Sequence, residues 1–272
     1  MCIRDSIYKF RQIRARISSY KNSLITVKAY FNNQELQEYD RESKRPELGK
    51  IYKEYVERCF KAGAMDFDDL LLKTNELLNL FPEVLFKYQE KFKYILVDEY
   101  QDTNHSQYLI VKSLADKYQN LCVVGDDSQS IYAFRGANIQ NILNFSRDYP
   151  NSITYRLEQN YRSTKNIVQC ANSLIQNNQF KLDKTIWTQN IDGEKITINK
   201  SISDSDEGRY IASNIFERKN NEFLSNSSFA VLYRTNAQSR AVEDALRKIN
   251  IEYQVFGGLS FYQRKEIKDI LA

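Results

Sequence analysis

The 272-residue sequence contains little of what marks metal-binding, disulfide-linked or membrane-spanning proteins. It has one histidine and four cysteines, and no two cysteines show the CxxC spacing of a zinc or redox site. It has no run of about 18 apolar residues, so we expect no membrane-spanning helix. No apolar stretch follows the first residues, so we expect no signal peptide either. The cysteine usage favours a protein of the reducing cytoplasm.

Glycine and proline are also scarce, with eight and three copies. No pair of glycines is separated by five positions, so the phosphate-binding loop GxxxxGK[ST] does not occur in this sequence. That loop supplies a lysine and a ring of backbone amides that hold the β- and γ-phosphates of a nucleotide. We therefore expect these 272 residues alone to show no measurable ATP hydrolysis.

The formal net charge of +4 is too small to indicate a nucleic-acid partner, but the charge is unevenly distributed. The first 30 residues contain a single acid, Asp5, and seven basic residues: Arg4, Lys9, Arg11, Arg14, Arg16, Lys21 and Lys28. A local excess of this kind suits contact with a phosphate backbone. A solvated helix face would give the same composition, and the charge alone favours that interpretation.

Helical patterns occupy much of the sequence. Residues 7–64 predict polar helices with a loop near residues 40–49. Asp66 is predicted to cap the next helix, with Asp69 at its third position. Apolar helix faces are also predicted after Thr164 and around Val242. Loops are expected at residues 192–193 and 201–208.

Four short apolar runs, each followed at once by polar or charged residues, predict buried β-strands at residues 94–97, 121–124, 153–157 and 229–232. Fully apolar strands that alternate with helices favour a parallel sheet covered on both faces. Ligands of such sheets bind at the carboxyl ends of the strands, where the polar clusters of this sequence fall. The sequence therefore predicts an α/β fold with a nucleotide site.

The first predicted strand ends in Asp98 and Glu99, and the string Tyr-Gln-Asp-Thr-Asn follows. A carboxylate at a strand end can hold Mg²⁺ beside a nucleotide, which suits Asp98. An adjacent carboxylate can deprotonate an attacking water, which suits Glu99. An isolated Asp-Glu pair is more often a surface feature. The apolar strand before this pair and the polar string after it make the pattern more specific.

The second predicted strand leads into a loop that combines the flexible amide of Gln129 with two aromatic rings, Tyr132 and Phe134, and with Arg135. Aromatic rings can stack on bases without reading their sequence, and arginine adds charge for the backbone. The alternative interpretation is that both rings only anchor the loop to the core.

The third predicted strand is followed by Tyr161 and Arg162, directly before a predicted helix. A strand end that leads into a helix N-terminus is a natural phosphate environment. Arg162 could act there as an arginine finger on a transferred phosphoryl group. The alternative is an exposed arginine beside an ordinary helix cap.

The three segments that follow the first, second and third predicted strands resemble, in this order, the corresponding segments of the superfamily 1 helicases of the Rep/PcrA/UvrD type. The resemblance covers residues 17–272 and includes residues 66–71, 231–240 and 257–269. These three further segments resemble the re-entry into the first motor domain, the opening of the second motor domain, and the start of the subdomain inserted into it.

The resemblance implies roles for individual residues. Asp98 would ligate Mg²⁺, and Glu99 would be the catalytic base. Gln129 would sense the γ-phosphate and Arg162 would touch it. The resemblance implies that Tyr161 stacks on the adenine. The other nucleotide-binding residues that it implies are Gln129, Arg162 and Asp126. The single-strand contacts would be Tyr132, Phe134 (where the family often has tryptophan), Arg135, Arg234, Asn236 and Arg240.

The resemblance also implies an incomplete architecture of RecA-like parallel-sheet domains of the P-loop NTPase type. Residues 1–64 would be a partial helical DNA-binding subdomain, 65–158 a partial first motor domain, and 159–272 the start of a second. The parent would be a cytoplasmic, ATP- and Mg²⁺-dependent 3′–5′ DNA helicase of repair or replication restart. Its partners would be single-stranded DNA, 3′-tailed duplex DNA and repair proteins. The alternative is a non-hydrolysing module that binds single strands or a repair partner.

Overall fold

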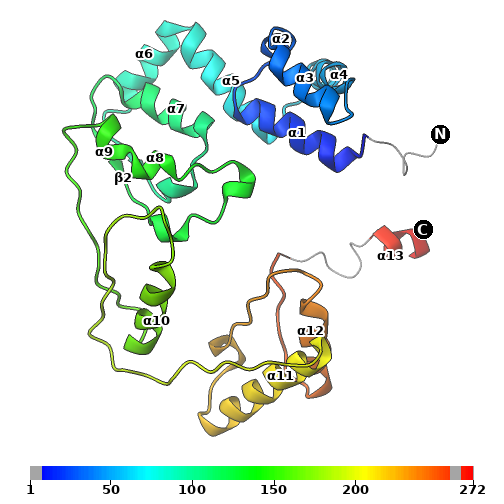
Figure 1. Ribbon diagram of the computed structural model, residues 1–272, viewed down its shortest axis with the longest axis vertical. Helices are drawn as coiled ribbons and strands as arrows, with labels where there is room; N and C mark the ends of the chain where they lie inside the picture. The colour runs from blue at the N-terminus through cyan, green and yellow to red at the C-terminus, as the bar shows by residue number, and fades with distance from the viewer. Residues whose placement is uncertain (1–7, 258–264, 272) are drawn as a thin grey trace. The chain divides into compact units, whose positions relative to one another are not determined.

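The computed structural model describes residues 8–257 and 265–271. Contacts between residues divide the chain into two compact units, Met1–Gly193 and Glu194–Ala272, and each is described by itself (Figure 1). The predicted boundaries after residues 64 and 158 remain predictions. None of the helices in the described ranges is long and apolar enough to cross a bilayer.

The first unit begins with four helices, α1 (Phe10–Asn22), α2 (Val27–Phe31), α3 (Gln34–Glu42) and α4 (Leu48–Lys61), which confirms the predicted helical character of this region. Their shared core consists of Ile13, Ile17, Tyr20, Tyr30, Leu48 and Tyr52. The buried carboxylate of Asp40 accepts hydrogen bonds from the hydroxyls of Tyr20 (2.5 Å) and Tyr30 (2.9 Å). Because buried polar groups must be paired, these bonds fix the register of α1, α2 and α3.

Helix α5 (Phe67–Leu80) begins at the predicted cap. The Asp66 carboxylate accepts a hydrogen bond from the Asp69 backbone amide (2.7 Å), and the Asp69 carboxylate accepts one from the Asp66 amide (3.2 Å). This reciprocal pair is the capping box that the sequence predicts. Helix α6 (Pro82–Lys91) follows α5 and leads to the sheet.

The sheet consists of two parallel strands, β1 (Ile95–Val97) and β2 (Leu121–Val123), with Leu96 opposite Cys122. Helix α7 (His105–Ala115) connects them, as a parallel pair requires. Both strands confirm sequence predictions, and a small parallel sheet among mostly helical elements agrees with the predicted α/β class. Leu96 is 78% exposed, so the expected cover on both faces of the sheet is not present.

The elements that follow the sheet are mostly short. Among the described residues of the first unit, three 3₁₀ turns lie at Tyr100–Asp102 (η2), Asp127–Gln129 (η3) and Ala133–Arg135 (η4). Helices α8 (Gln140–Leu143), α9 (Phe145–Asp148) and α10 (Lys165–Ile175) follow. Helix α10 confirms the helix predicted after Thr164.

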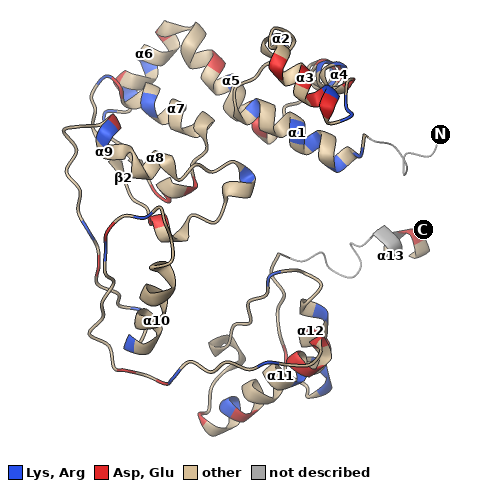
Figure 2. Ribbon diagram, viewed as in Figure 1, with Lys and Arg blue, Asp and Glu red and all other residues tan. Residues whose placement is uncertain are grey.

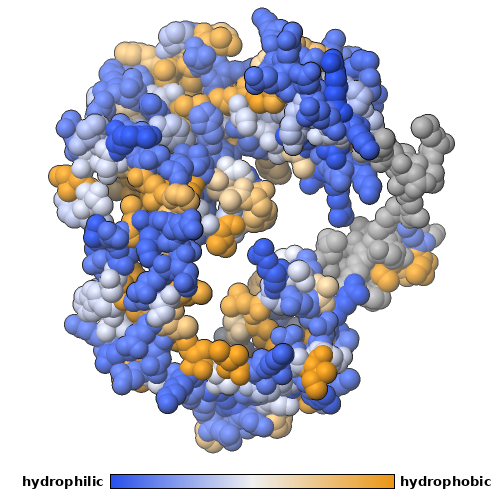
Figure 3. Space-filling view, in the orientation of Figure 1, coloured by the Kyte–Doolittle hydropathy of each residue, from blue (hydrophilic) through white to orange (hydrophobic). Residues whose placement is uncertain are grey.

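Two strand predictions are wrong. Residues 153–157 and 229–232 form no ladder, and the isolated bridge between Gln159 and Trp187 is all the pairing that lies near the first of them within the described ranges. A strand persists through hydrogen bonds to a neighbour, and apolar composition alone does not provide one. Residues 153–157 are all exposed, with Leu157 at 85%, whereas in the second segment Leu232 is 95% exposed but Val231 is half-buried against a core cluster. Figure 3 shows how apolar side chains reach the surface among hydrophilic ones.

The second unit is built on α11 (Asp204–Asn221) and α12 (Ser239–Lys248), with η5 (Asn226–Ser228) between them and α13 (Lys265–Leu271) after them. Its core contains Ala212, Val242, Leu246 and Ile251, which confirms the apolar face predicted around Val242. Gly208 permits the close approach of the two long helices, because a Cβ there would lie 2.4 Å from the Ala241 carbonyl oxygen. The loop predicted at 201–208 is wrong from Asp204 onward, since Ser203 caps α11 there.

Candidate nucleotide and single-strand site

The acidic pair lies at the carboxyl end of β1, and both side chains are exposed. The Glu99 backbone amide donates to the Asp98 carboxylate (2.9 Å). Glu99 has φ 50° and ψ 42°, the left-handed region that non-glycine residues rarely adopt. The next residue fixes this conformation, because the Tyr100 amide donates to the Val124 carbonyl oxygen (2.9 Å). Strained backbone of this kind clusters at functional sites.

The buried side chain of Gln101 joins the acidic pair to the following loop. Its amide nitrogen donates to the Glu99 carboxylate (2.7 Å), and its amide oxygen accepts a bond from the Asp126 backbone amide (3.0 Å). Gly125 permits this approach, because a Cβ there would lie 2.5 Å from the Gln101 oxygen. No sequence pattern indicated a role for Gln101. Gly125, two residues after the end of β2, was the one signal of a close approach at this place.

Asp126 organises the loop that contains Gln129. Its carboxylate accepts bonds from the Gln129 side chain (2.8 Å) and the Ser128 amide (3.0 Å), and Lys184 forms ion pairs with both Asp126 and Asp127. Burial alone would raise the pKa of Asp126, but the bonds from Lys184 and Gln129 outweigh it and lower the pKa. Burial likewise disfavours the Lys184 charge, yet the two aspartates raise its pKa. The Asp126 carboxylate is thus engaged by protein partners, and its role in nucleotide binding remains a prediction.

The predicted single-strand residues of this loop form one cluster. The rings of Tyr132 and Phe134 lie 6.0 Å apart at 39°, and the Arg135 guanidinium lies 5.1 Å and 5.4 Å from their centres. Phe134 is 78% exposed and Tyr132 37%, so Phe134 does not anchor the loop to the core. A backbone bridge between Asn104 and Ala137 attaches the cluster to the segment that follows the acidic pair.

Tyr161 and Arg162 lie exposed before α10. The Tyr161 hydroxyl donates to Gln159 (2.8 Å), and the Arg162 amide donates to the Asn160 side chain (3.0 Å). Within the described ranges, the Arg162 guanidinium makes no hydrogen bond or ion pair. The side chain is therefore available to a ligand, as the arginine-finger prediction requires.

The segment around Trp187 connects this corner to the Asp126 loop. The Trp187 amide donates to the Glu158 carbonyl (2.9 Å), and the Asn190 side chain donates to the Ser163 carbonyl (2.9 Å). Three residues before Trp187, Lys184 binds the Asp126 loop. The structure thus links the Tyr161 segment to the Gln129 loop through backbone and side-chain bonds.

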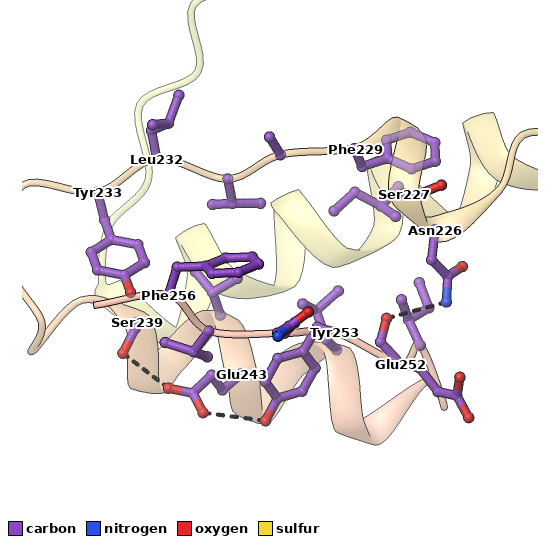
Figure 4. A pocket seen from close by; sticks show the side chains of 18 of the residues that line it. Asn226, Ser227, Phe229, Leu232, Tyr233, Ser239, Glu243, Glu252, Tyr253 and Phe256 are labelled. Carbon is purple, nitrogen blue, oxygen red and sulfur yellow. Dashed lines mark hydrogen bonds between the residues drawn. The ribbon is translucent and has the colours of Figure 1, made fainter. Parts of the chain in front are cut away.

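The remaining predicted DNA contacts belong to the second unit. The Gln238 side chain accepts bonds from the backbone amides of Arg234 (3.1 Å) and Thr235 (2.9 Å), and this turn leads into α12 with exposed Asn236 and Arg240. A cavity of about 910 Å³ lies between residues 229–233 and 251–257 over α12 (Figure 4). Asn236 lines it, and the other predicted site residues do not.

The exposed carboxylates of Asp98 and Glu99 have the chemistry and the free oxygen atoms that a weakly bound cation requires. The described residues contain no group of three or more side chains that could hold a metal ion, so a cation at this pair would have at most two protein carboxylates as ligands. One Asp98 oxygen accepts the Glu99 amide, which leaves the second oxygen to a ligand. Mg²⁺ commonly binds one or two carboxylates and takes its other ligands from water and nucleotide phosphates.

Comparison with known proteins agrees with the geometry. The UvrD/REP helicase N-terminal domain model matches residues 3–150, and the UvrD-like helicase C-terminal domain model matches residues 155–272. ATP-dependent DNA helicase PcrA from Bacillus subtilis (strain 168) is 47% identical over 262 residues, which covers 96% of this chain and 35% of that protein. PcrA from Leuconostoc citreum is 44% identical over 265 residues, covering 97% and 35%. The chain thus spans about a third of the length of these curated relatives, and it belongs to the UvrD/Rep family of superfamily 1 DNA helicases.

Proposed function

We propose that this chain is the part of an ATP-driven DNA helicase motor that contains the acidic pair, the single-strand loop and the Tyr161-Arg162 corner. One observation carries the proposal: the bonds from Glu99 through Gln101 to Asp126, and from Asp126 to Gln129, join a candidate catalytic base to a DNA-coupling loop. The relatives named ATP-dependent DNA helicase PcrA support the same conclusion.

The nucleotide would bind at the carboxyl end of a RecA-like sheet that begins with β1 and β2. Asp98 would hold Mg²⁺, which neutralises charge on the phosphates when it is bound. Glu99 would accept a proton from the attacking water. Gln129 and Arg162 would contact the γ-phosphate, and Tyr161 would stack on the adenine.

Single-stranded DNA would lie across Tyr132, Phe134 and Arg135. The two rings offer stacking surfaces that tolerate any base, and Arg135 offers charge to the backbone. Arg234, Asn236 and Arg240 would contact the backbone from the second unit. We propose 3′–5′ movement along single strands and opening of 3′-tailed duplex in repair or replication restart, in the cytoplasm and with repair proteins as partners.

Activity can be tested in a chimera in which this chain replaces the segment of Bacillus subtilis PcrA that it matches. The rest of a helicase polypeptide then surrounds the site. We expect ATP hydrolysis stimulated by oligo(dT), and a loss of at least about 100-fold in Glu99→Gln, because general base catalysis contributes roughly 10²–10⁴-fold. Glu83→Gln, an exposed acid on α6, is the control and should hydrolyse ATP like the unmodified chimera. Unchanged hydrolysis in Glu99→Gln would contradict the proposal.

The chimera distinguishes this proposal from the non-hydrolysing binding module, and the isolated chain does not. The absence of GxxxxGK[ST] from the sequence favours such a module for the chain alone. Both proposals predict oligo(dT) binding without ATP turnover by the isolated chain. They differ in the chimera, where only a motor component supports DNA-stimulated hydrolysis.

A further inference from the structure

We propose that Gln101 is a positioning residue that couples the DNA loop to the Glu99 carboxylate. The inference rests on the proposed function, because it assigns Gln101 a part in the same site. Its side chain is 1% exposed, and both ends of its amide are engaged. One end donates to the carboxylate of Glu99, and the other accepts the backbone amide of Asp126.

The surroundings leave the Gln101 side chain little freedom. Gly125 lies so close that a Cβ would meet the Gln101 oxygen at 2.5 Å and the Tyr100 amide at 3.2 Å. The Ser130 hydroxyl donates to the backbone carbonyl oxygen of Gln101 (3.4 Å). A displacement of the loop at Asp126 must therefore move or break the bond to the Gln101 amide.

The opposite end of the link is equally constrained. Glu99 has a left-handed backbone conformation that Tyr100 and Val124 hold in place. Its carboxylate position therefore depends on side-chain torsions and on the bond from Gln101. The same loop continues through the Asp126–Gln129 bond toward the exposed Tyr132 and Phe134. When DNA binds these rings and displaces the loop, the displacement would be transmitted to the Glu99 carboxylate through the buried side-chain amide of Gln101.

Two substitutions separate the two ends of the link. Gln101→Met keeps the length of the side chain and removes both bonds. Gln101→Glu keeps an acceptor for the Asp126 amide. Because burial beside Glu99 raises the pKa of the new carboxyl, this variant is measured at alkaline pH, where the ionised group cannot donate to Glu99. If Gln101→Met fails to fold, Gln101→Glu still tests the half of the link that matters for Glu99. Gln89→Met is the matched control, because Gln89 donates one comparable bond, to the Ser113 carbonyl (2.8 Å).

The first measurement uses the isolated chain and is independent of ATP and DNA. We expect Glu99→Gln to shift the backbone amide NMR signal of Asp126 when Gln101 is present. The shift should disappear in the Gln101→Met and Gln101→Glu backgrounds and persist with Gln89→Met. An equal shift with and without Gln101, or no shift at all, would overturn the link.

The second measurement uses the chimera with Bacillus subtilis PcrA. We expect Gln101→Met and Gln101→Glu to lower the ratio of oligo(dT)-stimulated to basal kcat by about tenfold or more, with the KM for ATP and the oligo(dT) affinity within about twofold of the unmodified chimera. An equal loss of basal and stimulated kcat would mean a merely structural role and would overturn the proposal. A chimera without DNA-stimulated hydrolysis would contradict the proposed function instead, and the NMR measurement would then decide the Gln101 link alone.

Discussion

Lys21 and Asp69 form an ion pair inside the first unit, with Nζ 2.8 Å from Oδ1 and with the lysine side chain completely buried. Lys21 also pairs with Asp66 at 2.7 Å, and Asp66 accepts a bond from the Tyr55 hydroxyl (2.7 Å). The two acids form the capping box of α5, so α1 is attached to the start of the element that leads to the sheet. Figure 2 shows the basic residues along α1, of which Lys21 is not available to DNA.

Replacement of Lys21 by methionine should strongly destabilise the first unit. The substitution leaves Asp66 and Asp69 without their cation, and breaking a buried ion pair by removing one partner costs about 3–5 kcal/mol. Chemical denaturation followed by circular dichroism measures the change. Lys28→Met, at an exposed position, should stay within about 0.5 kcal/mol of the unmodified chain. Equal stabilities of the two variants would contradict the structural role of Lys21.

The capping box should make stability depend on pH in the acid range. Burial alone would raise the pKa of Asp66, but the bonds from Lys21 and Tyr55 outweigh it and hold the pKa below its ordinary 3.8. A carboxyl with a depressed pKa in the folded state stabilises the fold above its unfolded pKa and loses that contribution as pH falls through the folded pKa. Between pH 5 and pH 2, the unmodified chain should therefore lose more stability than Asp66→Asn. Parallel pH profiles would show that the Asp66 charge has no such role.

Substitution of Gly49 tests the packing of the helical core. A Cβ at this position would lie 2.3 Å from Cε1 of the buried Tyr30 ring. Alanine favours a helix over glycine by about 1 kcal/mol, but overpacking costs about 1–3 kcal/mol, so we expect a net loss of up to about 2 kcal/mol in Gly49→Ala. Lys53→Ala, at an exposed position of the same helix, is the control for thermal unfolding. A more stable Gly49→Ala variant would contradict the packing.

Local signals in the sequence predicted local structure well. Asp66 and Asp69 are three residues apart, and the capping box they form needs no distant partner. The apolar runs before Asp98 and Gly125 became β1 and β2, which pair with each other. The segment that ends at Leu157 was also predicted to be a strand, but it forms no ladder, because a strand also needs a neighbour that its own residues do not specify.

The sequence pattern did not predict contacts between residues that lie far apart in the sequence. Lys21 looked like one member of a basic face, and its burial follows from partners 45 and 48 positions away. Gln101 looked like part of a polar string, and its role depends on Asp126, which lies 25 positions later. The cluster of Tyr132, Phe134 and Arg135 was predictable because its members are adjacent.

Substitution of Phe134 tests the single-strand surface on the isolated chain. Stacking contributes about 1–3 kcal/mol per base, which corresponds to roughly 5- to 150-fold in affinity. We expect Phe134→Ala to weaken binding of fluorescein-labelled oligo(dT) by about tenfold or more in fluorescence anisotropy, and Phe134→Trp to strengthen it. Phe86→Ala is the control, because Phe86 is 57% exposed on α6 and lies outside both the predicted DNA-binding subdomain and the predicted site. Equal losses in Phe134→Ala and Phe86→Ala would exclude stacking at this loop.

A crystal structure of the PcrA chimera with Mg²⁺ and a non-hydrolysable ATP analogue would show whether these residues form one nucleotide site. We expect the adenine on Tyr161, and the γ-phosphate within hydrogen-bond distance of both Gln129 and Arg162. We also expect the metal beside Asp98, with Glu99 facing the terminal phosphate. A nucleotide bound elsewhere, or Glu99 and Arg162 facing separate clefts, would contradict the proposed function.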